Sequence, residues 1–166
     1  VSFNFPANQP PVVTISPNQT VAGGQVVNLS GTATDPETDP LTTQFTQTSG
    51  PAVTLATTSS PTDVSFTAPA KTNAAQVLTF EFSATDTANN TSVASSTVTV
   101  LANQAPVANA GPDASVTAGS LVTLAGSFND PDNDPTSLQW RLVSGPVVTL
   151  NGATTATPSF TAPLPT

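Results

Sequence analysis

The sequence of 166 residues contains no cysteine, no histidine and no methionine. Without cysteine there is no disulfide framework and no thiolate chemistry. Without histidine or cysteine, the chain cannot form the usual structural zinc site or a Ser-His or Cys-His nucleophile pair. We therefore expect no catalytic residues. Hard cations that bind through oxygen remain compatible with this composition.

Charge is scarce and mostly of one sign. Two basic residues stand against 10 acidic ones, for a net charge of −8. Nucleic acid and anionic lipid would be repelled, so neither is an expected partner. The sequence has no signal peptide and no apolar run of transmembrane length, so we expect no direct membrane insertion. A secreted eukaryotic domain of this size more often carries a disulfide, which favours an exported prokaryotic protein at the cell surface or outside the cell.

Threonine and valine are abundant, and 17 prolines and 9 glycines punctuate them. This composition favours β-strands and turns over helices. In residues 77–84, Leu78, Phe80, Phe82 and Ala84 alternate with more polar side chains, which predicts that they face a core. Strands are predicted at 12–15, 21–29, 41–47, 53–55, 64–66, 77–84 and 97–101. About seven short strands in one module predict an all-β fold of the immunoglobulin-like sandwich type.

An internal repeat organises the chain. Asn8 recurs as Asn103, 95 residues later, and the acidic turn that begins at Asp35 recurs at Asp130. Phe45 and Trp140 hold equivalent positions and are predicted to anchor the two cores. The repeat predicts tandem modules. Residues 1–7 are the last strand of a preceding repeat, residues 8–102 a complete β-sandwich, and residues 103–166 a second, truncated one.

Two interpretations of the truncated module remain open. In the first, the chain is a fragment of a longer array. In the second, residues 1–5 complete the unfinished module of another copy by strand donation, which would build a filament. The leading segment supplies only the last strand, and a counterpart of residues 77–82 would still be missing. The count of strands therefore favours a fragment.

The motifs taken together resemble a known family. The run NQAPVANAGPDASVTAGSLVTLAGSFNDPDNDP is followed by LQWRLVSGPVVTL and PSFTAP. This order resembles the PKD-type (polycystic kidney disease) domains and their REJ-like relatives in bacterial surface and secreted proteins. The first module departs from the family pattern with Phe45 in place of the usual tryptophan. The resemblance implies tandem immunoglobulin-like sandwiches on extracellular proteins.

The resemblance also bounds the expected function. It implies a non-catalytic structural or adhesive module that spaces or presents other domains or forms a surface fibre. The alternative is a carbohydrate-binding or spacer module of a secreted polysaccharide hydrolase or protease. Expected partners are neighbouring repeats, copies of the chain itself, or cell-surface polysaccharide or protein. Fold analogy alone does not name the partner.

The two acidic turns are candidate cation sites. Asp35, Glu37 and Asp39 alternate with other residues in the first turn, and Asp130, Asp132 and Asp134 do so in the second. Carboxylates this close repel one another unless a counter-ion is present, and oxygen ligands suit Ca²⁺. The alternative is an ordinary solvated turn, since Asp and Pro are good turn formers.

The resemblance implies specific ligands, because some PKD-like domains bind calcium between the linker and this turn. In the second module the ligands would be Asn103, Asp130 and Asp132, and in the first module Asn8, Asp35, Glu37 and Asp86. Asp134 and Asp39 would be either extra ligands or groups that hold a ligand in place. Outside these turns, Glu81 is predicted on an exposed strand face. Trp140 is predicted in the core rather than on a sugar-binding surface.

Overall fold

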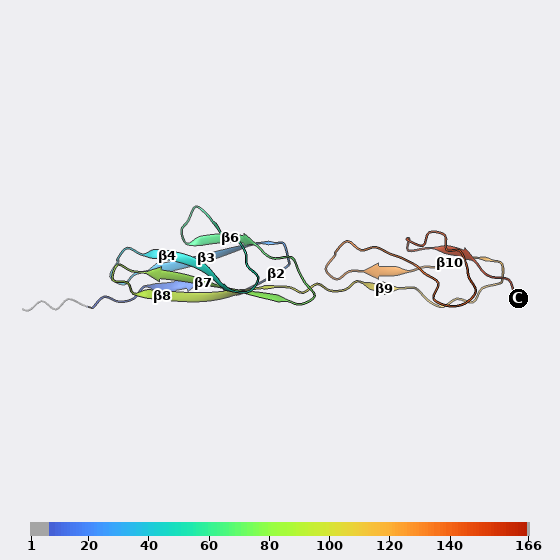
Figure 1. Cartoon of the computed structure of the whole chain (residues 1–166), viewed down its shortest axis with the longest axis horizontal. Coiled ribbons are helices and arrows are strands. Elements are labelled where there is room, and N and C mark those ends of the chain that lie inside the picture. The colour runs from blue at the N-terminus through green and yellow to red at the C-terminus, as the bar shows by residue number, and fades with distance from the viewer. Residues whose placement is uncertain (1–6, 166) are drawn as a thin grey trace, which may run out of the picture. The chain divides into compact units, whose positions relative to one another are not determined.

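The computed structural model describes residues 7–165 and contains twelve strands in that range (Figure 1). The chain divides into two compact units, Val1–Asn103 and Gln104–Thr166. The strand predicted at residues 1–7, and with it the donor segment 1–5, lies outside the described residues except for Ala7, which is in no strand. None of the described residues belongs to a helix that could span a membrane.

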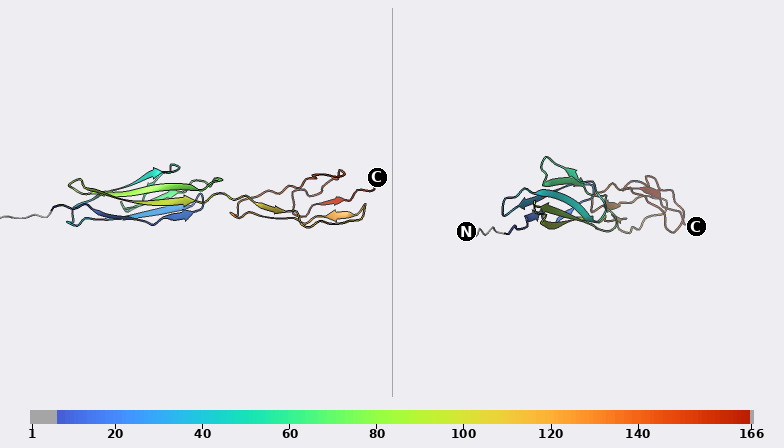
Figure 2. Two further views of the ribbon diagram at one scale, coloured as in Figure 1. Left: turned by 90° about the horizontal axis from the view of Figure 1, so that it is seen from below. Right: turned by 60° about the vertical axis from the view of Figure 1, so that its left-hand side comes forward.

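The first unit is an immunoglobulin-like β-sandwich, as the sequence predicts. One antiparallel sheet has the order β1-β3-β6-β5, formed by Val12–Ile15, Val26–Thr34, Asp63–Thr67 and Ala56–Thr57. The other has the order β2-β8-β7-β4, formed by Gln19–Val21, Thr91–Val100, Gln76–Thr85 and Thr42–Ser49. The long β7 and β8 strands form an antiparallel pair through the second sheet (Figures 1 and 2).

The predicted inward face of β7 is confirmed. Leu78, Phe80, Phe82 and Ala84 are each 0% exposed. Burial of each large apolar side chain contributes roughly 1.5–3 kcal/mol. The Phe80 ring packs against Phe66 with centroids 4.8 Å apart. Leu78 and Phe80 belong to the core cluster of the first unit, whereas the outward neighbours along β7 are partly buried or, at Val77, exposed.

The second inward phenylalanine of β7 depends on a glycine in the facing sheet. A Cβ built on Gly31 would lie 2.6 Å from ring carbons of Phe82. The Phe82 ring also packs against Phe45, with centroids 4.8 Å apart. Phe45 packs against the core cluster, as predicted. Only a residue without a side chain allows the ring to approach this closely.

Three predicted strand boundaries are wrong. The expected strand at 21–29 is two strands, because β2 ends at Val21 and β3 begins at Val26. Between them Gly24 has φ of 78°, a left-handed turn conformation. The strand predicted at 53–55 is instead β5 at 56–57. The last strand, β8, begins at residue 91 rather than 97. Its serines and threonines hide the alternation of inward and outward side chains in the sequence, whereas pairing with β7 imposes it in the structure.

The second unit repeats the first sheet of the sandwich. β9 (Val107–Asn109) pairs with β11 (Ser127–Asn129), and β10 (Leu121–Thr123) pairs with β12 (Ser159–Thr161). These pairs correspond to β1–β3 and β3–β6 of the first unit. No strand forms at the positions of β2 and β4, which in the first unit pair with β8 and β7. The 166 residues include no second copy of β7 and β8, the strands that would pair there.

Candidate metal site at the acidic turns

The two acidic turns have the same backbone structure. In the first, one carboxylate oxygen of Asp35, Oδ1, accepts the amides of Glu37 at 2.9 Å and Asp39 at 3.0 Å. In the second, Asp130 Oδ1 accepts the amides of Asp132 at 2.9 Å and Asp134 at 3.1 Å. Each leading aspartate therefore holds its own turn together, as Asp commonly does.

A left-handed residue completes each turn. Thr38 has φ of 69° and Asn133 has φ of 57°. Asparagine adopts this conformation readily, whereas a β-branched threonine does so at a cost. The residue at this position in the second turn is therefore better suited to the left-handed conformation than the residue in the first turn.

The second turn gathers its three carboxylates. Asp130, Asp132 and Asp134 each offer an oxygen within 4.8 Å of the others. Across residues 7–165 no other group of three acidic side chains meets this condition. Asp130 is only 9% exposed. Three carboxylates this close favour a bound cation, and oxygen donors suit Ca²⁺.

The first turn arranges its acids differently. Glu37 Oε2 accepts the backbone amide of Gln9 at 3.1 Å, and Glu37 Oε1 accepts the Gln9 side-chain amide at 3.0 Å. Both Glu37 oxygens therefore point to the entering chain. Asp39 Oδ2 accepts the Thr87 hydroxyl at 3.4 Å. Asp35 Oδ2 is buried and has no hydrogen-bond partner.

Asp86 lies at the β7–β8 turn and holds the start of the first unit. It is 5% exposed, and its Oδ2 accepts the Asn8 amide at 2.7 Å. Its Oδ1 accepts the backbone amides of Ala88 and Asn90, both at 2.8 Å. Burial raises the pKa of Asp86, but hydrogen bonds from Asn90, Asn8 and Ala88 outweigh it and hold the pKa below its usual 3.8.

The predicted ligands are only partly brought together. Asn8 meets Asp86, and the three aspartates of the second turn meet one another. Asn103 belongs to the first unit, where its amide donates to the Thr72 carbonyl at 2.7 Å. The four acids predicted for the first site form no group of three within 4.8 Å; these are Asp35, Glu37, Asp39 and Asp86.

The residue after each linker asparagine was missed as a functional position. Gln104 donates its backbone amide to Asp132 Oδ2 at 2.6 Å, as Gln9 does to Glu37. Both contacts span 28 residues and recur with the repeat. The Asn-Gln pair that recurs at both linkers could have pointed to these positions. A backbone amide is present whatever the side chain, however, so the sequence does not show which residue donates it.

Glu81 and Trp140, the other candidates from the sequence, lie at positions that suit structural roles. Glu81 lies on the outer face of β7, opposite Thr46 and Ser95. The Trp140 indole donates from Nε1 to the Thr155 carbonyl at 3.0 Å, and its ring covers Gly126. Trp140 is half-buried at the edge of a groove. Phe128, 47% exposed, is the one large aromatic with an exposed ring among residues 7–165.

The chain is similar to one domain family and to part of a known enzyme. A family model described as K319L-like, PKD domain, matches residues 16–100 and 110–166. Chitinase A of Pseudoalteromonas piscicida is 31% identical over 139 residues, which is 81% of this chain. The chain spans 16% of the length of that relative.

Two solved structures are also similar. The titin domains Z1Z2, crystallised in complex with telethonin, match 93% of this chain and 82% of that one, with 18% identity and a TM-score of 0.53. This likeness concerns the fold alone. A nucleoside hydrolase-related hypothetical protein from Saccharophagus degradans covers 57% of this chain and 26% of its own, with 17% identity and a TM-score of 0.44.

Proposed function

The chain belongs to this PKD domain family, and from that premise we propose that it is a non-catalytic extracellular module that spaces or presents the other domains of its parent protein. PKD and immunoglobulin-like domains are generally non-catalytic modules. The sequence adds no histidine or cysteine that would supply a nucleophile–base pair. Tandem units of this kind are suited to an exported array, either as a spacer or as part of a surface fibre.

One observation carries this proposal: each unit binds the backbone of the chain that enters it. Gln9 and Gln104 each donate an amide to the middle acid of the acidic turn. Since hydrogen bonds to charged groups are stronger than neutral ones, each contact would hold the first residues of a unit against that unit's own acidic turn. We propose that this limits independent movement of neighbouring domains, which is what a spacer requires.

The tether can be tested on the 166-residue chain by residual dipolar couplings. In Asp132→Ala the acceptor for Gln104 is lost, and the alignment of the second unit should weaken relative to the first. Asp113→Ala removes the same charge from an exposed loop of the same unit and should leave the ratio of the alignment magnitudes of the two units unchanged. If the wild type, Asp132→Ala and Asp113→Ala all give the same ratio, a spacer role for this tether is refuted.

Calcium binding at the second turn is part of the proposal. Asp130, Asp132 and Asp134 have the charge and the oxygen donors for Ca²⁺, and their spacing within 4.8 Å supports it. The bound ion would supply positive charge that removes the repulsion among them. The first turn fits less well, because both Glu37 oxygens already accept hydrogen bonds from Gln9. Its buried Asp35 Oδ2 remains available to a cation.

A second candidate function is a module within a polysaccharide-degrading enzyme, which the similarity to a chitinase favours. As a spacer, the chain would not bind the polymer itself. As a carbohydrate-binding module it would need an exposed ring, and Phe128 is the described candidate. Co-sedimentation with insoluble chitin separates the two. Retention that is lost in Phe128→Ala identifies a binding module, whereas no retention identifies a spacer.

A further inference from the structure

Asn151 is the one asparagine of the sequence that is followed by glycine. Asparagine is a thermolabile residue, and it is most reactive before glycine, because no Cβ hinders attack of the glycine amide nitrogen on the asparagine side chain. Asn151 is exposed, and its side chain has no hydrogen-bond partner among residues 7–165. The side chain can therefore rotate toward the amide of Gly152.

The attacking group is available as well. Within residues 7–165 the Gly152 amide donates to no acceptor. After several other asparagines the following amide already donates to a carboxylate; these are the amides of Gln9, Asn90, Gln104 and Asp134. A hydrogen bond from the protonated form keeps the proton on the nitrogen and so suppresses its attack. The fold thus protects those asparagines and leaves Asn151 reactive.

We propose that Asn151 is a self-modification site, which is converted into aspartate and isoaspartate as the protein ages. The Gly152 nitrogen forms a bond to Cγ of Asn151 and gives up its proton. The bond from Cγ to the side-chain nitrogen breaks, and that nitrogen leaves with the proton as ammonia. Water then opens the succinimide ring. Opening at Cγ gives aspartate, and opening at the main-chain carbonyl carbon gives isoaspartate.

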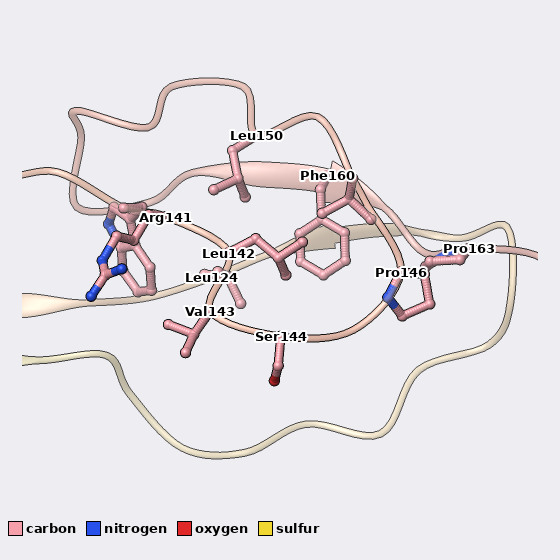
Figure 3. A pocket seen from close by; sticks show the side chains of 11 residues that line it. Leu124, Arg141, Leu142, Val143, Ser144, Pro146, Leu150, Phe160 and Pro163 are labelled. Carbon is pink, nitrogen blue, oxygen red and sulfur yellow. The ribbon is translucent and has the colours of Figure 1, made fainter.

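The turn that contains Asn151 is anchored at both ends. Asn151 and Ser159 exchange two backbone hydrogen bonds, of 2.8 Å and 2.9 Å. Beside them, the side chains of Leu150 and Phe160 line the same apolar pocket (Figure 3). The repeat places this turn where β5 lies in the first unit, at the edge of the first sheet. An extra backbone atom in the turn therefore cannot be absorbed by movement of its ends.

The same turn holds Trp140. The Trp140 backbone amide donates to the Ala153 carbonyl at 2.7 Å, and its indole Nε1 donates to the Thr155 carbonyl at 3.0 Å. Isoaspartate inserts a methylene group into the main chain just before Gly152, which displaces both carbonyls. Hydrogen bonds weaken steeply when they are misaligned. Modification therefore releases Trp140 and adds negative charge to a chain whose net charge is already −8.

The first test ages the 166-residue chain in mildly alkaline buffer. Cleavage after Arg141 by trypsin releases residues 142–166, in which Asn151 is the sole asparagine. Mass spectrometry should show replacement of NH2 by OH in this fragment, and isoaspartyl methyltransferase should label it. The rate should rise with pH, because the deprotonated nitrogen attacks. Asn73 is also exposed but precedes alanine, and should react several-fold more slowly. An unmodified fragment, or an equally fast reaction at Asn73, overturns the proposal.

The second test measures the consequence. As isoaspartate accumulates, Trp140 emission should shift to longer wavelength and the melting temperature of the second unit should fall. Asn151→Gln keeps the amide but requires a larger ring, so the aged variant should keep both values. Fresh Asn151→Asp has the charge on an unaltered main chain and should also keep them. Release of Trp140 is overturned if aged wild type matches aged Asn151→Gln, or if fresh Asn151→Asp matches aged wild type.

Discussion

The side-chain amide of Asn8 donates to Asp86 across 2.7 Å, although the two residues are 78 positions apart. Asp86 also accepts two backbone amides of its own turn and the side chain of Asn90. A nearly buried carboxylate is thus stabilised entirely by hydrogen-bond donors. The same contact attaches the start of the first unit to the β7–β8 turn.

Removal of Asn8 should loosen that attachment. We expect Asn8→Ala to lower the urea midpoint of the first unit, because Asp86 loses one of its donors while staying buried. Asn73→Ala, at an exposed bend, is the matched control and should leave the midpoint close to that of the wild type. Amide signals of the first unit report the transition. Equal midpoints in the two variants would mean that the Asn8 contact contributes nothing.

Asp86 should also make stability depend on pH. Its pKa is lowered in the folded state, so its contribution is fully present above the unfolded pKa of 3.8. That contribution should be lost as pH falls through the lower folded pKa, because the unfolded chain then binds more protons. Urea midpoints measured from pH 7 to pH 2.5 should fall less steeply in Asp86→Asn than in wild type. Parallel curves would contradict this assignment.

The contact between Gly31 and Phe82 predicts a non-additive pair of substitutions. Gly31→Ala should destabilise the first unit by about 1–3 kcal/mol, because its Cβ meets the buried ring. In a Phe82→Val background the same change should cost much less, since the ring is gone. A double-mutant cycle from urea unfolding measures the coupling. Additive effects would show that the cost of alanine arises elsewhere.

Calcium should stabilise the second unit. Titration of Ca²⁺ into the 166-residue chain should raise the melting temperature reported by Trp140 fluorescence, with saturation near the millimolar range typical of extracellular modules. Asp134→Asn should remove the response, and Asp113→Asn should retain it. Mg²⁺ should act more weakly, because it gives up its water reluctantly. A melting temperature that does not change in about 10 mM calcium would refute the site.

Local sequence patterns determined the parts of the fold that need no knowledge of distant contacts. The alternation of Leu78, Phe80 and Phe82 was enough to predict a buried face, since side chains on a strand point alternately to its two sides. The recurrence of Asn8 at Asn103 predicted a repeated module. The Asp-Pro turns were recognisable because Asp bonds its own backbone and Pro restricts φ.

Tertiary structure decided which of these groups meet. Asn8 and Asp86 come together across 78 residues, and Gln9 and Glu37 across 28. No local pattern encodes such pairings, because the first depends on how the two sheets pack and the second on how β1 pairs with β3. The same holds for Glu37, whose oxygens turn to Gln9 rather than toward Asp35 and Asp39. The sequence by itself determined the strands, the turns and the repeat. Tertiary structure decided which acids accept hydrogen bonds from the linker and which three lie close together.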